Sequence, residues 1–300
     1  MFNRKLLGQL FVLFLGTQST YMKIDDKKLL RIVGGLNISH GKYPYVARLE
    51  LLRFTAAKPR RAHICTCSIL TPTWSLTASH CSLSLSKAPN FSLVIRYGST
   101  LPLDEKGNYS NVLKFVPHPS FKFLGDTKNV YNLENDIALL KTDPVMLPKY
   151  GRVSAVDYMS LFGFKAVVAG FGRTNYTKLN KIFFASTLRL NMPLQSLNVL
   201  IKRCANDISV KVYPGICLAR KCGQTVSVCA GDSGGPLIHN SQIIGVNSLA
   251  PLMDCSDKIE DRLKSRHVGI ITAASPFTEW IGEVINENTV ASSHTDGKIA

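Results

Sequence analysis

From residue 32 onward, the hydrophobic residues of this chain fall in short runs that are rich in β-branched side chains and separated by turn residues. Four such runs are residues 92–97, 166–169, 242–246 and 269–272. Runs of this length and composition predict β-strands, and many short strands at this spacing favour barrels or a sandwich. The pattern therefore predicts an all-β fold for most of the chain.

One late segment has a helical period instead. Ser275 can cap its N-terminus, and Pro276 suits a first helical turn. The apolar residues that recur at helical spacing after it are Phe277, Trp280, Ile281, Val284 and Ile285. We expect a C-terminal helix here, followed over residues 286–300 by a small and polar tail without fixed structure.

The first 20 residues have the layout of a secretory signal peptide. Arg4 and Lys5 precede an apolar run from Leu6 to Gly16, and this run is too short to span a membrane. We therefore expect a secreted, extracellular protein with a signal peptide over residues 1–20. A short polar segment over 21–31 then leads into one folded region over 32–285.

Cysteines and glycosylation motifs agree with secretion. The chain has eight cysteines, which fit a compartment where disulfides form. Four Asn-X-Ser/Thr motifs supply candidate glycosylation sites at Asn37, Asn90, Asn108 and Asn175.

The chain is strongly basic, with a formal net charge of +16. Residues 1–31 hold six basic and two acidic residues, a net +4, so the chain from Ile32 onward keeps +12. Such a field attracts polyanions or acidic substrates. The basic residues are scattered, however, without interleaved aromatic residues. A solvated basic surface is therefore favoured over a specific polyanion site, and no specific nucleic-acid partner is expected.

Three motifs contain residues that could act together in nucleophilic catalysis. They are Gly-Asp-Ser-Gly-Gly-Pro at 231–236, Leu-Thr-Ala-Ser-His-Cys at 76–81 and Asn-Asp-Ile-Ala-Leu-Leu at 135–140. A serine hydroxyl is a poor nucleophile until a base takes its proton and a carboxylate orients that base. Glycines let backbone N–H groups turn toward one point, where they can hold an oxyanion.

With Arg-Ile-Val-Gly-Gly at 31–35 upstream, the chain resembles the trypsin/chymotrypsin family of secreted serine endopeptidases. The four motifs stand in the family's order, and Ser79 replaces the alanine that is usual before the family's histidine. The resemblance covers about residues 31–281. It implies an all-β fold of two six-stranded antiparallel β-barrels, with the active site in the cleft between them and a helix at the C-terminus.

The resemblance also implies a role for each site residue. Ser233 is the expected nucleophile, His80 the general base and Asp136 the carboxylate that orients it. The N–H groups of Gly231 and Ser233 would bind the oxyanion. Ser248 matches the family serine that supports the aspartate and begins the substrate-binding strand.

Residues 21–31 then become an expected activation peptide, and 32–285 the protease domain. Cleavage between Arg31 and Ile32 would create a new ammonium group, which the family pairs with the position of Asp232. The expected product is an active enzyme made from a zymogen.

The resemblance places Ser227 at the floor of the substrate pocket, with Gly269 and Ala250 on its walls. A buried lysine or arginine side chain needs a charge partner, and serine supplies none. We therefore expect cleavage after apolar residues. The expected substrate preference is chymotrypsin-like, with a shift toward an elastase-like preference. Such an enzyme would not cut efficiently at Arg31, so a trypsin-like partner must activate it.

Three disulfides follow from the resemblance: Cys65–Cys81, Cys204–Cys217 and Cys229–Cys255. A fourth family pair is replaced by Ala166 and His239. Cys67 and Cys222 are left over; they could pair with each other, bond another chain or stay as buried thiols, which is the interpretation we favour.

The sequence thus predicts a secreted, monomeric serine endopeptidase that acts on protein or peptide substrates and has no membrane partner. Residues 101–111 lack an acidic loop like trypsin's calcium site, so we expect no metal and no other cofactor. The alternative is a secreted, non-catalytic binding protein that uses the same scaffold and acts through its basic surface. The intact set of His80, Asp136 and Ser233 favours the enzyme.

Overall fold

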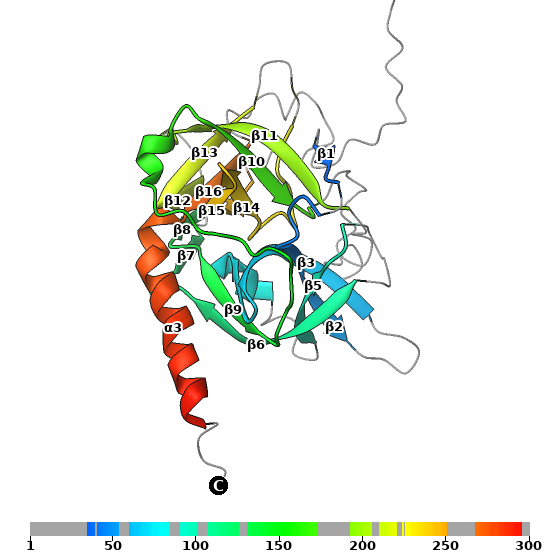
Figure 1. The fold of residues 1–300 in the computed structure, drawn as a ribbon. Helices are drawn as coiled ribbons and strands as arrows, with labels where there is room; N and C mark the ends of the chain where they lie inside the picture. The colour runs from blue at the N-terminus through cyan, green and yellow to red at the C-terminus, as the bar shows by residue number, and fades with distance from the viewer. Residues whose placement is uncertain are drawn as a thin grey trace, which may run out of the picture.

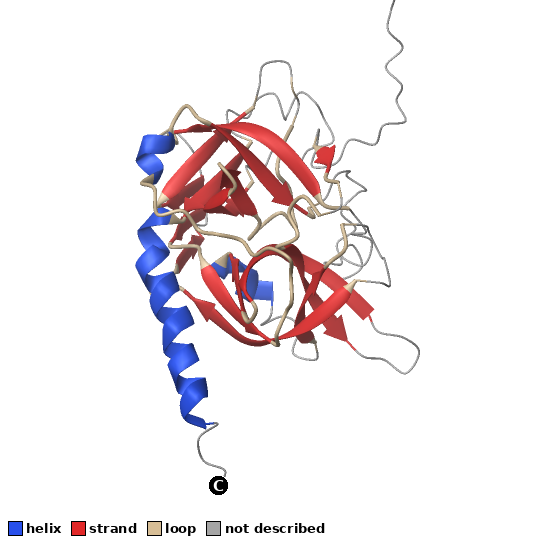
Figure 2. Ribbon diagram, viewed as in Figure 1, coloured by secondary structure: helices blue, strands red, loops and turns tan. Residues whose placement is uncertain are grey.

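The structure is a computed structural model. It describes residues 35–39, 41–53, 60–84, 91–100, 107–125, 131–172, 193–205, 210–220, 224, 226–250 and 268–295. Two β-barrels lie one above the other in Figure 1, and a long helix runs along one side of both. Figure 2 shows how strongly strands dominate the described chain.

The first barrel is a closed ring of six antiparallel strands in the order β2-β3-β4-β9-β6-β5. These strands are β2 (Val46–Arg53), β3 (Arg60–Thr71), β4 (Trp74–Thr77), β5 (Ser92–Tyr97), β6 (Asn108–Pro117) and β9 (Ala138–Thr142). Side chains from different strands fill the interior, among them Leu49, Ile69, Leu76 and Leu139, all at most 1% exposed. Burial of these apolar groups closes the ring.

The second barrel also has six strands in a ring, β11-β10-β14-β15-β16-β13, closed by pairing of β11 with β13. These are β10 (Lys165–Gly170), β11 (Gln195–Lys202), β13 (Gly215–Ala219), β14 (Pro236–His239), β15 (Gln242–Leu249) and β16 (Gly269–Ala273). In β11 every second residue is buried, so Leu197, Val199 and Ile201 face the core. Strand β1 (Leu36–Asn37) pairs with the first two residues of β11, Gln195 and Ser196. The expected two-barrel fold is confirmed.

A small third sheet was not expected from the sequence. It contains β7 (Lys122–Gly125), β8 (Tyr131–Glu134) and β12 (Val210–Tyr213), and β12 runs parallel to β8. Beyond β8, the Asn135 N–H donates to the Tyr213 carbonyl at 2.8 Å. The sheet therefore fixes the chain immediately before Asp136.

The C-terminal helix is present, but two details of the expectation are wrong. A 3-10 turn, η3 (Ser275–Phe277), precedes helix α3 (Thr278–Thr295). The N-cap of η3 is Ala274, whose side chain cannot form a hydrogen bond, and the Ser275 hydroxyl accepts from the Tyr158 N–H. The helix also continues to Thr295, through much of the segment expected to be a disordered tail.

This C-terminal helix packs against the first barrel although the chain enters it from the second. Phe277 and Ile281 belong to the core cluster that contains the first-barrel residues. The His118 ring meets Phe277 and Trp280 edge-on, at centroid distances of 5.0 and 4.9 Å. No described helix is long and apolar enough to cross a membrane.

Two expected disulfides are present, Cys65–Cys81 and Cys204–Cys217, with Cα–Cα distances of 6.3 and 4.9 Å. Cys229 is also disulfide-bonded, whereas Cys222 and Cys255 lie outside the described residues. Cys67 is a buried free thiol, as expected. The sulfurs of Cys65 and Cys81 lie near His80, but their disulfide leaves no thiolate to bind a metal ion there.

Candidate active site

His80 and Asp136 of the first barrel are joined by two hydrogen bonds. His80 lies in the 3-10 helix η1 (Ser79–Ser84), which follows β4 directly, and Asp136 lies between β8 and β9. The His80 Nδ1 is 2.7 Å from Asp136 Oδ2, and the His80 backbone N–H donates to Oδ1 at 2.8 Å. The Ser248 hydroxyl, which comes from the second barrel, also donates to Oδ2.

The electrostatics keep Asp136 ionised. Burial alone would raise the pKa of this carboxyl, but the charge of His80 and the hydrogen bonds from His80 and Ser248 lower it below its usual value. An ionised carboxylate only accepts hydrogen bonds, so the proton of the His80 imidazole lies on Nδ1. Nε2 is then left with the lone pair that a base requires.

The pKa of His80 is set by the same pair of residues. Burial of the ring lowers the pKa, but the charge of Asp136 and its hydrogen bond to the ring outweigh burial, so the His80 pKa is raised. Asp136 thereby stabilises the protonated form of the ring.

Ser233 lies in a tight loop at the start of β14. Gly231 and Gly234 have φ of 97° and 81°, which favour glycine. The loop is pressed against the first barrel, because a Cβ on Gly234 would lie 2.1 Å from Thr77 Oγ1. It thus touches the chain just before His80. Within the described ranges, no hydrogen bond joins the Ser233 hydroxyl to His80.

Two side chains of β3 hold the Gly231 carbonyl, and sequence reasoning missed both. His63 Nε2 lies 3.1 Å from this oxygen, and Thr66 Oγ1 donates to it at 2.8 Å. Burial, followed by the charge of Arg48, lowers the pKa of His63 to about 3. The ring is therefore neutral, and its Nε2–H donates to the carbonyl.

Asp232 is fully buried behind this loop. Its carboxylate accepts from the N–H groups of Gly172 and Cys229, at 2.7 and 2.9 Å. A Cβ on Gly170 or Gly172 would lie 2.3 Å from the carboxylate. Glycine is therefore needed at both positions for the Asp232 carboxylate to lie this close to the backbone. Burial raises the pKa of Asp232 to about 7, although the two hydrogen bonds lower it. Arg31 and Ile32 lie outside the described residues.

Ser227 is buried, and its hydroxyl is turned toward the backbone. It donates to the carbonyl of Val228 at 3.0 Å and lies 3.3 Å from that of Val268. A Cβ on Gly269 would lie only 2.6 Å from Val228 Cγ2, so the valine side chain faces Gly269. The resemblance placed Gly269 on a wall of the expected pocket, and the structure adds Val228 as the side chain that meets it.

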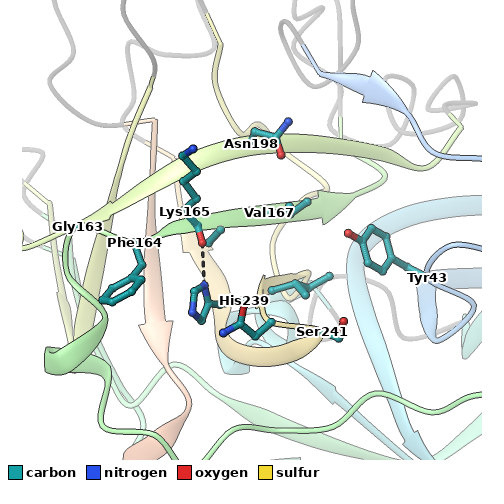
Figure 3. Close-up of a pocket in the computed structure, with 11 residues that line it drawn as sticks. Tyr43, Gly163, Phe164, Lys165, Val167, Asn198, His239 and Ser241 are labelled. Carbon is teal, nitrogen blue, oxygen red and sulfur yellow. Dashed lines mark hydrogen bonds between the residues drawn. The ribbon is translucent and has the colours of Figure 1, made fainter.

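His239 has a structural partner of its own. Its Nδ1 donates to the Lys165 carbonyl at 2.8 Å, across the β10–β14 junction (Figure 3). The Phe164 ring meets it edge-on at a centroid distance of 5.6 Å. These contacts give His239 a structural role at the position of a missing family cysteine. A hollow of about 510 Å³ beside this junction is lined by several polar residues, but by none of the expected site residues.

Of the glycosylation candidates, Asn37 and Asn108 lie on exposed strand positions. Asn90 and Asn175 lie outside the described residues.

A family model described as trypsin matches residues 32–281. The chain belongs to the trypsin family. The matched span includes all three expected catalytic residues and both barrels, so family membership and fold agree.

Curated relatives match along most of their length. A trypsin of Phaedon cochleariae is 26% identical over 278 residues, covering 87% of this chain and 91% of the relative. Human kallikrein-5 is 26% identical over 272 residues, covering 88% and 80%. Among solved structures, neuropsin, a serine protease expressed in the limbic system of mouse brain, aligns with a TM-score of 0.58 and 19% identity, covering 84% of this chain and 98% of neuropsin. The last similarity supports the fold alone.

Proposed function

We propose that the chain is a secreted serine endopeptidase that is made as a zymogen. The observation that carries the proposal is the oriented His80–Asp136 pair, supported by Ser248 and placed where the Gly231–Gly235 loop meets the first barrel. Family membership makes proteins and peptides the expected substrates. The signal-like N-terminus and the disulfides support secretion.

The chemistry follows from the proton positions. His80 Nε2 takes the proton of the Ser233 hydroxyl while Oγ attacks the scissile carbonyl, and the N–H groups of Gly231 and Ser233 bind the oxyanion. The peptide C–N bond then breaks, and His80 gives its proton to the leaving amine. Water, activated by the same base, hydrolyses the acyl-enzyme and restores Ser233.

The environment of Asp232 supports activation by cleavage. The carboxylate is buried, and its raised pKa reflects a charge that two N–H groups do not fully compensate. The new ammonium of Ile32 would supply a counter-ion and hold the adjoining Gly231 loop in place. Because Ser227 offers no partner to a cationic side chain, a trypsin-like protease would cut at Arg31.

The pocket residues support a preference for apolar side chains. The Ser227 hydroxyl is already used by backbone carbonyls, and the valine at 228 presents methyl groups toward Gly269. An apolar side chain can replace water there without leaving a charge unpaired.

A fluorophosphonate probe tests the function directly. After cleavage at Arg31, the wild-type protein should be labelled at Ser233, while Ser233→Ala should not react. Absence of labelling in correctly cleaved wild-type protein would instead favour a non-catalytic binding protein on this scaffold.

A further inference from the structure

Thr66 lies in the contact between the two barrels and forms hydrogen bonds across it. It is in β3 of the first barrel and is completely buried. Its backbone N–H donates to the Ser233 carbonyl at 2.7 Å, and its own carbonyl accepts from the Thr77 hydroxyl at 3.0 Å. One residue therefore connects the serine loop with the strand that leads to His80.

The Thr66 hydroxyl adds two further contacts. It donates to the Gly231 carbonyl at 2.8 Å and accepts from the Phe171 N–H at 3.2 Å. A hydroxyl has one proton to donate and lone pairs to accept with, so both bonds can exist together. The hydroxyl thus bridges the oxyanion loop to the segment that carries Gly172, a hydrogen-bond donor to Asp232.

The Gly231 carbonyl is held from two directions, by Thr66 and by His63. Free rotation at Gly231 would be easy, because glycine has the widest backbone freedom of any residue. An oxyanion hole works only if its donors point at the oxyanion before the reaction begins. The two hydrogen bonds to the Gly231 carbonyl restrict rotation of the peptide group between Gly231 and Asp232, which directly follows the Gly231 N–H.

We propose that the Thr66 hydroxyl is a positioning group that keeps the Gly231 loop in the geometry needed for transition-state binding. Thr66 does not touch substrate; it acts through the Gly231 carbonyl. The inference rests on the proposed peptidase function, which it deepens by naming what orders the loop.

Two substitutions separate the hydroxyl from the shape of the side chain. Thr66→Val removes the hydroxyl and keeps the branched methyl that lies near Gly235. Thr66→Ser keeps the hydroxyl and removes that methyl. Thr142→Val is a matched control, since this buried threonine of β9 has a hydroxyl without a hydrogen-bond partner among the described residues.

The activated variants should be compared in kcat, KM and affinity for a peptide aldehyde, which forms a tetrahedral adduct. Thr66→Val should lower kcat about tenfold with KM unchanged, a smaller loss than deletion of an oxyanion donor causes. The aldehyde affinity should fall in parallel, because it reports transition-state binding. Thr66→Ser and Thr142→Val should both resemble the wild type.

Hydrogen exchange of the peptide containing residues 231–235 gives a readout that does not need activity. Exchange should be faster in Thr66→Val than in the wild type and in Thr142→Val. Unchanged exchange, or a lower kcat without weaker aldehyde binding, would overturn the inference. If cleaved wild-type protein fails to react with the fluorophosphonate, the proposed function fails, while the exchange comparison still decides whether Thr66 orders the loop.

Discussion

The hydroxyl of Ser79 donates a hydrogen bond of 2.6 Å to the carbonyl of Ile137. Ser79 immediately precedes His80, and Ile137 immediately follows Asp136, so this bond ties the two segments together just beside the His80–Asp136 pair. It is additional to the two bonds between His80 and Asp136 themselves. The serine in place of the usual alanine therefore contributes a specific contact.

Ser79→Ala should lower stability by about 1 kcal/mol, as expected for one lost buried hydrogen bond. The loss should not be larger, because the Ile137 carbonyl also accepts from the His118 N–H at 3.0 Å. Urea unfolding would measure it. Ser82→Ala is a suitable control, since Ser82 lies in the same 3-10 helix and donates to the Ser79 carbonyl instead. Only Ser79→Ala should also lower kcat/KM; an equal loss in both variants would contradict a role in aligning the pair.

The acidic limb of the pH–rate profile should report His80. The ring must be neutral to accept a proton, so kcat/KM should fall as pH drops through the His80 pKa, which Asp136 raises. Asp136→Asn removes the charge that stabilises the protonated ring. The limb should therefore move to lower pH while the plateau rate falls steeply. A limb that stays in place in Asp136→Asn would show that another group controls it.

The all-β class was predictable because many short β-rich runs indicate it, and the two-barrel architecture followed from the resemblance that the four ordered motifs carry. The contacts that complete the site were not. Thr66 and His63 bind a carbonyl more than 160 residues further along the chain, and no local pattern encodes such a pair. The β8–β12 pairing joins two four-residue strands whose partners are 79 residues apart in the chain. Ser275 looked like a cap, but its hydroxyl is used by Tyr158 from another element.

Asp232 should give the uncleaved precursor a distinctive pH dependence of stability. Its pKa is raised from 3.8 to about 7, so the folded state binds a proton that the unfolded state has lost in this window. The contribution of this bound proton to the free energy of unfolding is therefore fully present below the ordinary pKa of 3.8. It is lost as the pH rises toward 7. Asp232→Asn should abolish this slope.

The measurement is the difference in unfolding free energy between the two precursors at several pH values. Taking the difference cancels the contributions of His63 and Glu50, whose pKa values are also shifted by burial. After cleavage at Arg31, the Ile32 ammonium should stabilise the ionised Asp232 carboxylate. The contribution of Asp232 to wild-type stability should then increase with rising pH and not decrease. Cleaved Asp232→Asn should stay nearly inactive, and full turnover by it would contradict the activation switch.

Val228 should determine how large a side chain the pocket accepts. Its Cγ2 lies 2.6 Å from the place where a Cβ on Gly269 would stand, so its methyl groups limit the space that the glycine leaves. On matched peptide substrates ending in Phe, Leu, Ala and Arg, the activated wild type should prefer the apolar residues over Arg, because Ser227 supplies no charge. Val228→Ala should raise the ratio of kcat/KM for Phe to that for Ala by about tenfold, the effect of a methylene-scale change.

Val199→Ala is the matched control for this experiment, because Val199 is equally buried in the same barrel but lies in β11. Both variants create a cavity and should lose stability, so thermal unfolding alone cannot separate them. The substrate ratio can, since only Val228 faces Gly269. An equal shift of the Phe-to-Ala ratio in both variants would mean that weaker packing of the barrel, and not the size of the pocket, determines the substrate preference. A dominant rate for Arg in the wild type would refute the assignment of Ser227 to the pocket floor.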